Sequence, residues 1–241
     1  MQPTFLATQL YTVFRYSLSE IERAIAQTSH VDPMQSTRCF RLALSDLGEI
    51  YLLPFILKLL QRVAPQVELE VIQVEVSRLD EWLSTGKIDA AICNRSFTPV
   101  QAQSDLIFNE RYVCMIREDH PRIGEQLSLE QYLCEKHVVV SAATGHHFVE
   151  DRLRESGYER KISLRVPHFS GLPEVISNTD LLVTLPSRTA KLFTSHSRTR
   201  VVELPFNVPE IEVSMFWQEH GGDSTAQRWF CSALKTALLG V

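Results

Sequence analysis

The chain has 241 residues, with 24 Lys and Arg against 29 Asp and Glu, a formal net charge of −5 and 44% hydrophobic residues. This length allows one large core or two lobes of about 100 residues each, close to the usual domain size. No apolar run approaches the roughly 20 residues that a membrane span requires. The acidic balance also lacks the basic footprint of a DNA-binding surface. Composition therefore predicts a two-lobed globular protein that does not itself bind DNA.

The N-terminal residues 1–7 show no basic segment followed by an apolar one, so we predict no secretory signal and a cytoplasmic location. The cysteines are odd in number, widely separated and mostly in apolar context, which predicts reduced core thiols rather than disulfides: Cys39, Cys93, Cys114, Cys134 and Cys231. A redox switch is the alternative, and it requires an exposed thiol in an electropositive setting.

Residues 8–27 form the first predicted element. Leu10, Val13, Phe14, Leu18 and Ile21 follow the three-to-four spacing of an amphipathic helix. A polar stretch that ends in a proline comes next, which predicts a linker. The apolar stripe would pack on its own domain or pair with a second chain, and the pattern fits both.

From residue 39 onward, strand-like and helical runs alternate, and an amphipathic helix over 226–239 closes the chain. This order predicts βαβ units, and hence parallel sheets with crossover helices. No Gly/Ser-rich linker divides the two halves, so the chain must pass between lobes as continuous strands. We expect one crossing near 110–113 and a return near 212–216, which together would make a hinge. The predicted runs are 39–45, 47–64, 67–74, 79–83, 90–94, 112–117, 129–134, 138–141, 148–157, 162–166, 173–178, 181–185, 188–193, 201–204 and 212–218.

Signature motifs of common enzymes are missing from the sequence, including G-x-G-x-x-G, G-x-x-x-x-G-K-[ST], G-x-S-x-G and H-E-x-x-H. We therefore predict no catalytic residues and no cofactor. A metal site is an alternative at His146, His147, Glu150 and Asp151, where one pair lies one helical turn apart. Polar residues at the start of a helix more often cap it, so we predict no metal.

Two predicted strands end in polar loops that lead directly into helices. Ser45 and Asp46 follow the first of these strands, and Thr144, Gly145 and His146 follow the other. Hydroxyls, backbone N–H groups and imidazole at helix N-termini could hold an anion at the carboxyl ends of the strands. The plainer alternative is that they only cap helices. The Asp46 carboxylate would repel an anion unless backbone N–H groups satisfy it.

A third loop, after the strand 162–166, carries His168 and Phe169. An imidazole and an aromatic ring at a strand end would suit a flat aromatic ligand. Taken alone, a loop histidine of this kind is more often satisfied by the protein itself.

Several segments together resemble the effector-binding region of LysR-type transcription regulators over nearly the whole chain. The branch with naphthalene and nitrotoluene catabolism regulators, which answer to salicylate-like aromatic acids, is the most similar; flavonoid-responsive nodulation regulators are more distant. The M-x-P-T start resembles the segment that closes the winged helix-turn-helix of this branch. The segments are 1–4, 37–49, the Leu-Pro around Pro54, 111–115, 119–121, 144–146, 166–169 and 178–182.

The resemblance implies an α/β fold of two Rossmann-like lobes joined by a two-strand hinge, of the type 2 periplasmic-binding-protein kind, preceded by a linker helix. Residues 1–30 would be the linker and dimerisation helix, 37–111 plus 215–241 lobe one, and 112–214 lobe two. The DNA-binding domain would lie upstream of residue 1. Effector-binding positions would be Ser45, Leu47, Asn94, Thr144, Gly145, His146, His168, Phe169 and Phe216.

The implied function is that of a ligand-sensing domain. A small effector, aromatic or a carboxylate, would bind between the lobes and modulate transcription. The implied partners are this inducer, a second copy of the chain in a homodimer or tetramer, and DNA through the N-terminal domain, with no membrane. Departures at 94–96 and 147–148 predict a differently shaped pocket, in which Arg95 could pair a carboxylate. A solute-binding receptor of the same fold and an enzyme are the alternatives.

Overall fold

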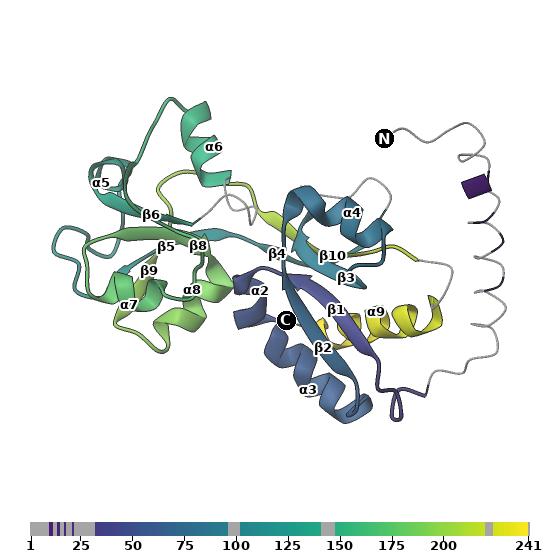
Figure 1. Cartoon of the computed structure of the whole chain (residues 1–241). Coiled ribbons are helices and arrows are strands. Elements are labelled where there is room, and N and C mark those ends of the chain that lie inside the picture. The colour runs from purple at the N-terminus through teal and green to yellow at the C-terminus, as the bar shows by residue number, and fades with distance from the viewer. Residues whose placement is uncertain are drawn as a thin grey trace.

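The computed structural model describes residues 10, 11, 14, 17, 21, 32–95, 102–140, 148–219 and 224–240. Two five-stranded sheets organise the chain, and Figure 1 shows them side by side with helices packed around each. We call the part built on the sheet that contains the strand β1 (Cys39–Leu44) the first lobe, and the part built on the other sheet the second lobe.

The first lobe has the strand order β2-β1-β3-β10-β4. β2 and β3 run parallel to β1, whereas β10 runs antiparallel to both β3 and β4. Its elements are β1 (Cys39–Leu44), α2 (Asp46–Tyr51), α3 (Leu53–Val63), β2 (Glu68–Gln73), the 3-10 helix η1 (Val76–Arg78), α4 (Leu79–Ser84), β3 (Ala90–Asn94), β4 (Gln103–Glu110), β10 (Ile211–Trp217) and α9 (Ser224–Leu238).

The second lobe has the strand order β7-β6-β8-β5-β9. β6 pairs in parallel with β7 and β8, and β5 runs antiparallel to β8 and β9. Its elements are β5 (Tyr112–Arg117), α5 (Leu129–Cys134), β6 (Lys136–Val140), α6 (Phe148–Glu155), β7 (Lys161–Val166), α7 (Leu172–Ser177), β8 (Leu182–Pro186), α8 (Ser187–Thr194) and β9 (Thr199–Val202).

Each sheet has an apolar core on both faces. Successive side chains of a strand point to opposite sides, so one strand contributes to both cores. In β1, Phe40 and Leu42 join the core beneath α3 and α9, while Ala43 joins the core beneath α4. The ring of Phe40 stacks on that of Phe230 from α9, with centroids 4.4 Å apart. Burial of each large apolar side chain contributes about 1.5–3 kcal/mol, so these two layers hold the first lobe together.

The α/β fold with two lobes is confirmed, but three details differ from the predictions. The sheets are mixed rather than parallel, since β5 and β10 run against their neighbours. The single helix predicted over 47–64 is two helices that meet at Leu52, because Pro54 occupies the first turn of α3, where its missing N–H costs nothing. The edge strand β4 was not predicted.

The chain passes between the lobes twice. The outward crossing is the single residue Arg111, between β4 and β5, and the return crossing lies between Val202 and Ile211. The boundary predicted at 215 falls inside β10, which pairs with first-lobe strands from its first residue. A two-pronged ion pair between Arg111 and Glu203 ties the two crossings together.

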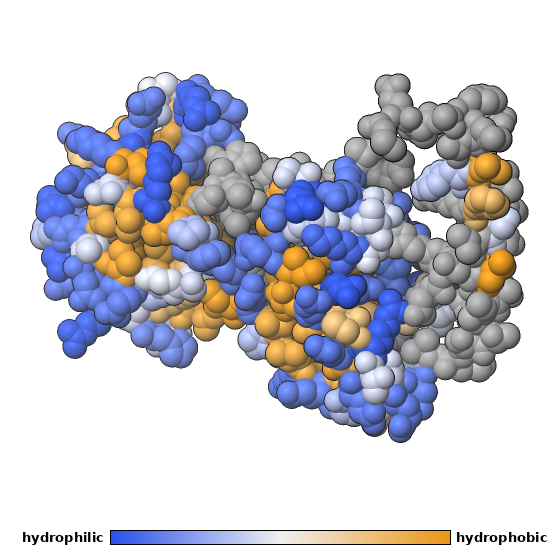
Figure 2. All heavy atoms as spheres, in the orientation of Figure 1, coloured by the Kyte–Doolittle hydropathy of each residue, from blue (hydrophilic) through white to orange (hydrophobic). Residues whose placement is uncertain are grey.

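Of the predicted linker helix, Leu10, Tyr11, Phe14, Ser17 and Ile21 are described, and all five are helical and exposed. Hydrophobic side chains of this segment stand clear of the lobes in Figure 2. The remaining residues of 1–30 lie outside the described part of the chain, and the dimerising role stays a prediction. None of the described helices combines the length and apolar character that crossing a membrane demands.

Candidate functional site

A cavity of about 70 Å³ opens between the two lobes, several times the volume that one water molecule needs. It lies at the carboxyl ends of β1, β2 and β3, the edge where open α/β sheets bind ligands. α8 of the second lobe covers its other side. We call it the inter-lobe cavity, and its wall consists of Ser45, Leu47, Gly48, Tyr51, Leu52, Val74, Ile92, Cys93, Asn94, Phe108, Glu110, Pro186, Thr189, Ile211 and Val213.

Ser45 and Leu47 reach this wall because α2 begins directly after β1. The Ser45 hydroxyl accepts the backbone N–H of Gly48 at 3.3 Å and so caps the helix. Leu47 lines the cavity and also packs, with Ile50, into the core between β5 and α7 of the second lobe. The helix α2 therefore packs against both lobes: Tyr51 contacts the core of the first lobe, and Leu47 and Ile50 contact the core of the second.

The far end of the cavity is formed by β3. Asn94 is buried and pairs through its backbone with Val213 of β10. Its neighbour Cys93 also lines the wall, and burial raises the pKa of the Cys93 thiol to about 12. The thiol is therefore uncharged at neutral pH, and it gives this end of the cavity a neutral surface.

Glu110 is the charged residue of the wall, and its carboxylate is surrounded by groups of the crossing residue Arg111 and of α8 in the second lobe. One oxygen accepts the Ser187 hydroxyl at 2.7 Å, the Ser187 backbone N–H at 3.1 Å and the Arg111 N–H at 2.9 Å. The other oxygen lies 3.6 Å from the Arg188 guanidinium. A carboxylate at the first turn of a helix is favourable because it meets unpaired N–H groups and the positive end of the helix dipole. Glu110 thus holds α8 against the cavity.

Asp46 makes a second contact between the lobes. Its carboxylate accepts the backbone N–H groups of Phe169 and of Ser170, the latter at 3.3 Å. The negative charge of Asp46, which was expected to repel an anion unless backbone N–H groups satisfied it, is therefore bonded to backbone N–H groups of the second lobe. Phe169 itself is 1% exposed and lies in the core of the second lobe, outside the cavity wall.

Three of the nine predicted positions, Ser45, Leu47 and Asn94, come together in this wall. Phe216 is fully buried beneath α4, on the opposite face of the first sheet, because it alternates with the cavity-side residues of β10. His168 is exposed in its loop and does not line the cavity. Thr144, Gly145 and His146 lie outside the described residues.

Sequence reasoning missed the wall residues that come from β4, β10 and α8. Phe108 and Glu110 belong to the unpredicted strand β4, and Ile211 and Val213 belong to a strand expected to begin at 212. The apolar triplet 106–108 between polar residues was a usable strand signal. The placement of Thr189 had no sequence signal, since it follows from how α8 packs across the lobes.

Comparison with known proteins gives the class of this chain. Residues 35–239 match the family model described as the LysR substrate binding domain. The chain is 31% identical to the HTH-type transcriptional activator NagR of Ralstonia sp. over 95% of its own length and 76% of the relative's. It is also 31% identical to the HTH-type transcriptional activator NahR of Pseudomonas putida, over 95% and 77% of the two chains.

A crystal structure of a probable transcriptional regulator from Pseudomonas aeruginosa aligns with a TM-score of 0.78 and 29% identity, over 98% of this chain and 79% of the other. The fold and the cavity between its two lobes are those of an effector-sensing domain of a transcription regulator. The chain belongs to the LysR family, and residues 35–239 form its substrate-binding domain.

Proposed function

We propose that this chain senses a small aromatic effector in the inter-lobe cavity and thereby controls transcription. The single observation that supports this best is that residues of both lobes line one cavity at the carboxyl ends of parallel strands. Most of its wall is apolar, and Tyr51 and Phe108 contribute aromatic rings, which suits a flat, largely apolar ligand.

A carboxylate on the effector is the second part of the proposal. It is supported by the family and by the predicted helix N-terminus at 144–146, which would add backbone N–H groups and an imidazole. We also propose His168 and Arg95 as supporting contacts, although neither lines the described wall and Arg95 pairs with Glu212 at 3.1 Å. Within the described wall the charged residue is Glu110, so the negative charge of the effector would have to face away from it.

The proposed mechanism is a population shift. An effector that contacts both lobes binds one relative arrangement of the lobes more tightly than others and so enriches that arrangement. We propose that the protein works as a homo-oligomer in the cytoplasm. The N-terminal DNA-binding domain of the family would then read the shift at DNA, with no catalytic step and no cofactor. A solute receptor of the same fold would bind a similar ligand, and an enzyme would turn it over.

A thermal-shift screen with benzoate, salicylate and their uncharged amides tests the proposal. A ligand at 100 times its Kd stabilises the protein by about 2.7 kcal/mol, which a melting curve resolves. Val213→Phe should remove the shift, because the added ring fills the cavity. Val201→Phe, at a half-buried position of β9 outside the wall, should keep it. Shifts that survive Val213→Phe would place the ligand elsewhere, and turnover of a probe would favour the enzyme.

A further inference from the structure

Arg188 reaches from the first turn of α8, in the second lobe, to three residues of the first lobe. Its guanidinium lies 3.6 Å from the Glu110 carboxylate and 3.4 Å from the Tyr51 hydroxyl. Its central carbon also lies 4.5 Å from the centre of the Phe108 ring, a cation–π distance. One side chain therefore contacts α2 and β4 of the opposite lobe at once.

The three partners of Arg188 share one property, which is that all of them line the inter-lobe cavity. Tyr51 and Phe108 also contact each other, edge to face, with ring centroids 6.3 Å apart. A molecule in the cavity would touch these groups on one side while Arg188 holds them on the other. Any movement of the two rings or of the carboxylate changes the surroundings of the guanidinium directly.

We propose that Arg188 is a positioning residue that couples occupancy of the inter-lobe cavity to the placement of α8 and hence to the arrangement of the lobes. This inference rests on the proposed function, since it presumes that an effector fills the cavity. Coupling requires that the effector interact differently with the two arrangements. Arg188 meets this requirement because the wall residues that a ligand contacts are the same residues that anchor α8.

Ser187 shares this property in part, because its hydroxyl and backbone N–H bond to the wall residue Glu110, but it is Arg188 that reaches Tyr51 and Phe108 as well. The contact at Asp46 lacks the property. Asp46 bonds to backbone amides of Phe169 and Ser170, and none of these three residues lines the cavity. Leu47 lines the cavity, but its link to the second lobe is apolar packing, which has no direction. Loss of the Asp46 contact should therefore loosen the lobes whether the cavity is filled or empty, whereas loss of Arg188 should weaken the response to filling.

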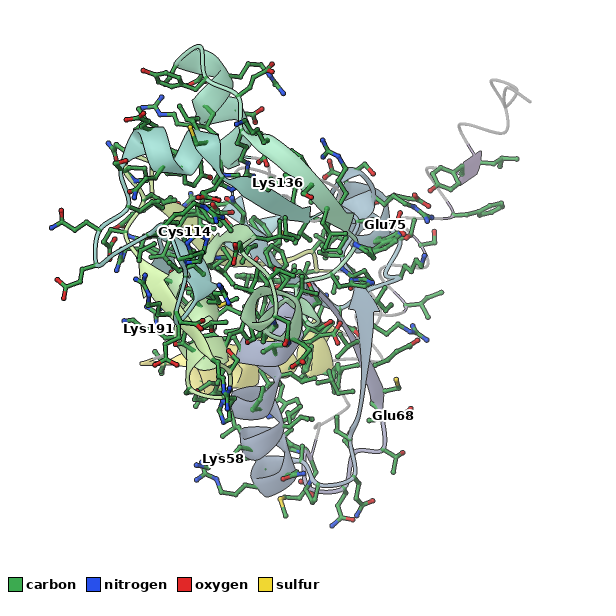
Figure 3. All side chains as sticks on the ribbon, turned by 90° about the vertical axis from the view of Figure 1, so that its left-hand side faces the viewer. Lys58, Glu68, Glu75, Cys114, Lys136 and Lys191 are labelled. Carbon is green, nitrogen blue, oxygen red and sulfur yellow. The ribbon has the colours of Figure 1, made fainter. Side chains whose placement is uncertain are left out.

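The test is hydrogen exchange of the 241-residue chain, followed at α8 with and without benzoate or salicylate, whichever gives the larger thermal shift. The variants are Arg188→Gln, which removes the charge, and Arg188→Lys, which keeps the charge but lacks the planar group that stacks on Phe108. The control is Lys191→Gln, since Lys191 is exposed on the same helix (Figure 3).

In the unaltered chain and in Lys191→Gln, the probe should slow exchange in the first turn of α8 by at least about fivefold, the lower end of typical couplings. In Arg188→Gln the slowing should fall well below that of the control while the probe still binds, because among the described residues of α8 only Thr189 and Ser187 keep their contacts with the cavity wall. Arg188→Lys should restore part of it. Without any probe, Arg188→Gln should already speed exchange of this turn.

Two results overturn the inference and leave the proposed function in place: a slowing in Arg188→Gln equal to that of the control, or unchanged exchange of its α8 without probe. If no probe gives a shift that Val213→Phe removes, the proposed function fails, and the inference fails with it. The two failures are distinguished by whether the unaltered chain binds a probe in the cavity.

Discussion

The Asp46 carboxylate in the first lobe accepts the backbone N–H of Phe169 in the second lobe. This bond and a second one to the Ser170 N–H join the first residue of α2 to a loop of the second lobe, and the Asp46–Ser170 pair is 124 residues apart in sequence. Asp46 is 8% exposed, so water replaces these bonds poorly when they are lost. The contact between the lobes on this side is therefore a buried, charge-assisted one.

Asp46→Ala should lower the free energy of unfolding by about 1–3 kcal/mol, the cost of leaving buried amides without an acceptor. Asp46→Asn should cost less, because its carbonyl oxygen can still accept. Asp119→Ala is the control: that side chain is 84% exposed and pairs with Arg117 only at 3.5 Å, so a change within about 0.5 kcal/mol is expected. Urea denaturation measures all three, and an Asp46→Ala value equal to the control would contradict the role of this contact.

A buried ion pair fixes α6 on the second lobe. The Arg160 side chain is 6% exposed, pairs with Glu150 of α6 and donates to the Tyr132 hydroxyl at 3.0 Å. Glu150→Gln removes the countercharge from a buried guanidinium and should destabilise the protein by about 3 kcal/mol or more. Glu155→Gln, on the same helix, breaks a solvent-exposed pair with Arg152 and should cost less than about 1 kcal/mol. Equal midpoints in urea for the two variants would rule out this view of α6.

Acid should destabilise the protein through His137. Its ring is fully buried, donates from Nε2 to the Tyr132 carbonyl at 2.6 Å, and burial lowers the pKa of His137 to about 4. The unfolded chain binds a proton near pH 6.5, whereas the folded chain does so only near pH 4. The stability that this group contributes is therefore fully present above pH 6.5 and is lost as the pH falls from 6.5 to about 4.

The expected loss by pH 4 is on the order of 3 kcal/mol, from about 1.4 kcal/mol per unit of pKa difference. Unfolding free energies measured between pH 7 and pH 5 limit the contribution of carboxylates, which stay mostly ionised there, and comparison with His137→Asn separates His137 from the other histidines. His137→Asn should be less stable overall but should show a flatter pH dependence over this range. An unchanged slope would assign the acid sensitivity to other groups.

The cysteines should differ widely in reactivity. Cys134 is exposed, whereas burial raises the pKa of both Cys93 and Cys114 to about 12; Figure 3 labels Cys114 within the second lobe. Because the thiolate is the reactive form, a disulfide reagent at pH 8 should modify Cys134 first, Cys93 in the cavity wall more slowly, and the buried Cys114 only after unfolding. Cys134→Ser should remove the fast phase. A fast phase that remains in this variant would indicate that one of the predicted core thiols opens to solvent.

Local pattern was enough to place many elements. The strands at 90–94 and 112–117 and the helix at 129–134 have the predicted bounds, because continuous apolar runs or a Ser128 capping box mark their ends. β4 was not predicted because it is an edge strand with one neighbour and because five of its eight residues are polar. A strand that is half exposed shows a weak apolar period.

Of the effector positions that the family resemblance implied, the three that line the cavity all lie at strand ends. Ser45, Leu47 and Asn94 lie at or just after the ends of β1 and β3, which the sequence located. Phe108 and Glu110 reach the cavity through antiparallel pairing of β4 with β10, a contact between segments about 100 residues apart. Arg188 likewise reaches its partners Glu110 and Tyr51 through contacts between segments far apart in the sequence. Such long-range pairings depend on tertiary packing, which local periodicity does not encode.

The packing of α2 against both lobes matters when lobes are exchanged between related proteins. Leu47 and Ile50 fill the core of the second lobe although the chain reaches α2 before it ever leaves the first. A graft of residues 112–210 alone would leave the α2 side chains that pack in this core behind in the donor. The grafted lobe would then have to pack against the α2 of the recipient. A chimera that transfers ligand response should therefore exchange α2 together with the second lobe, so that the packing partners travel as one unit.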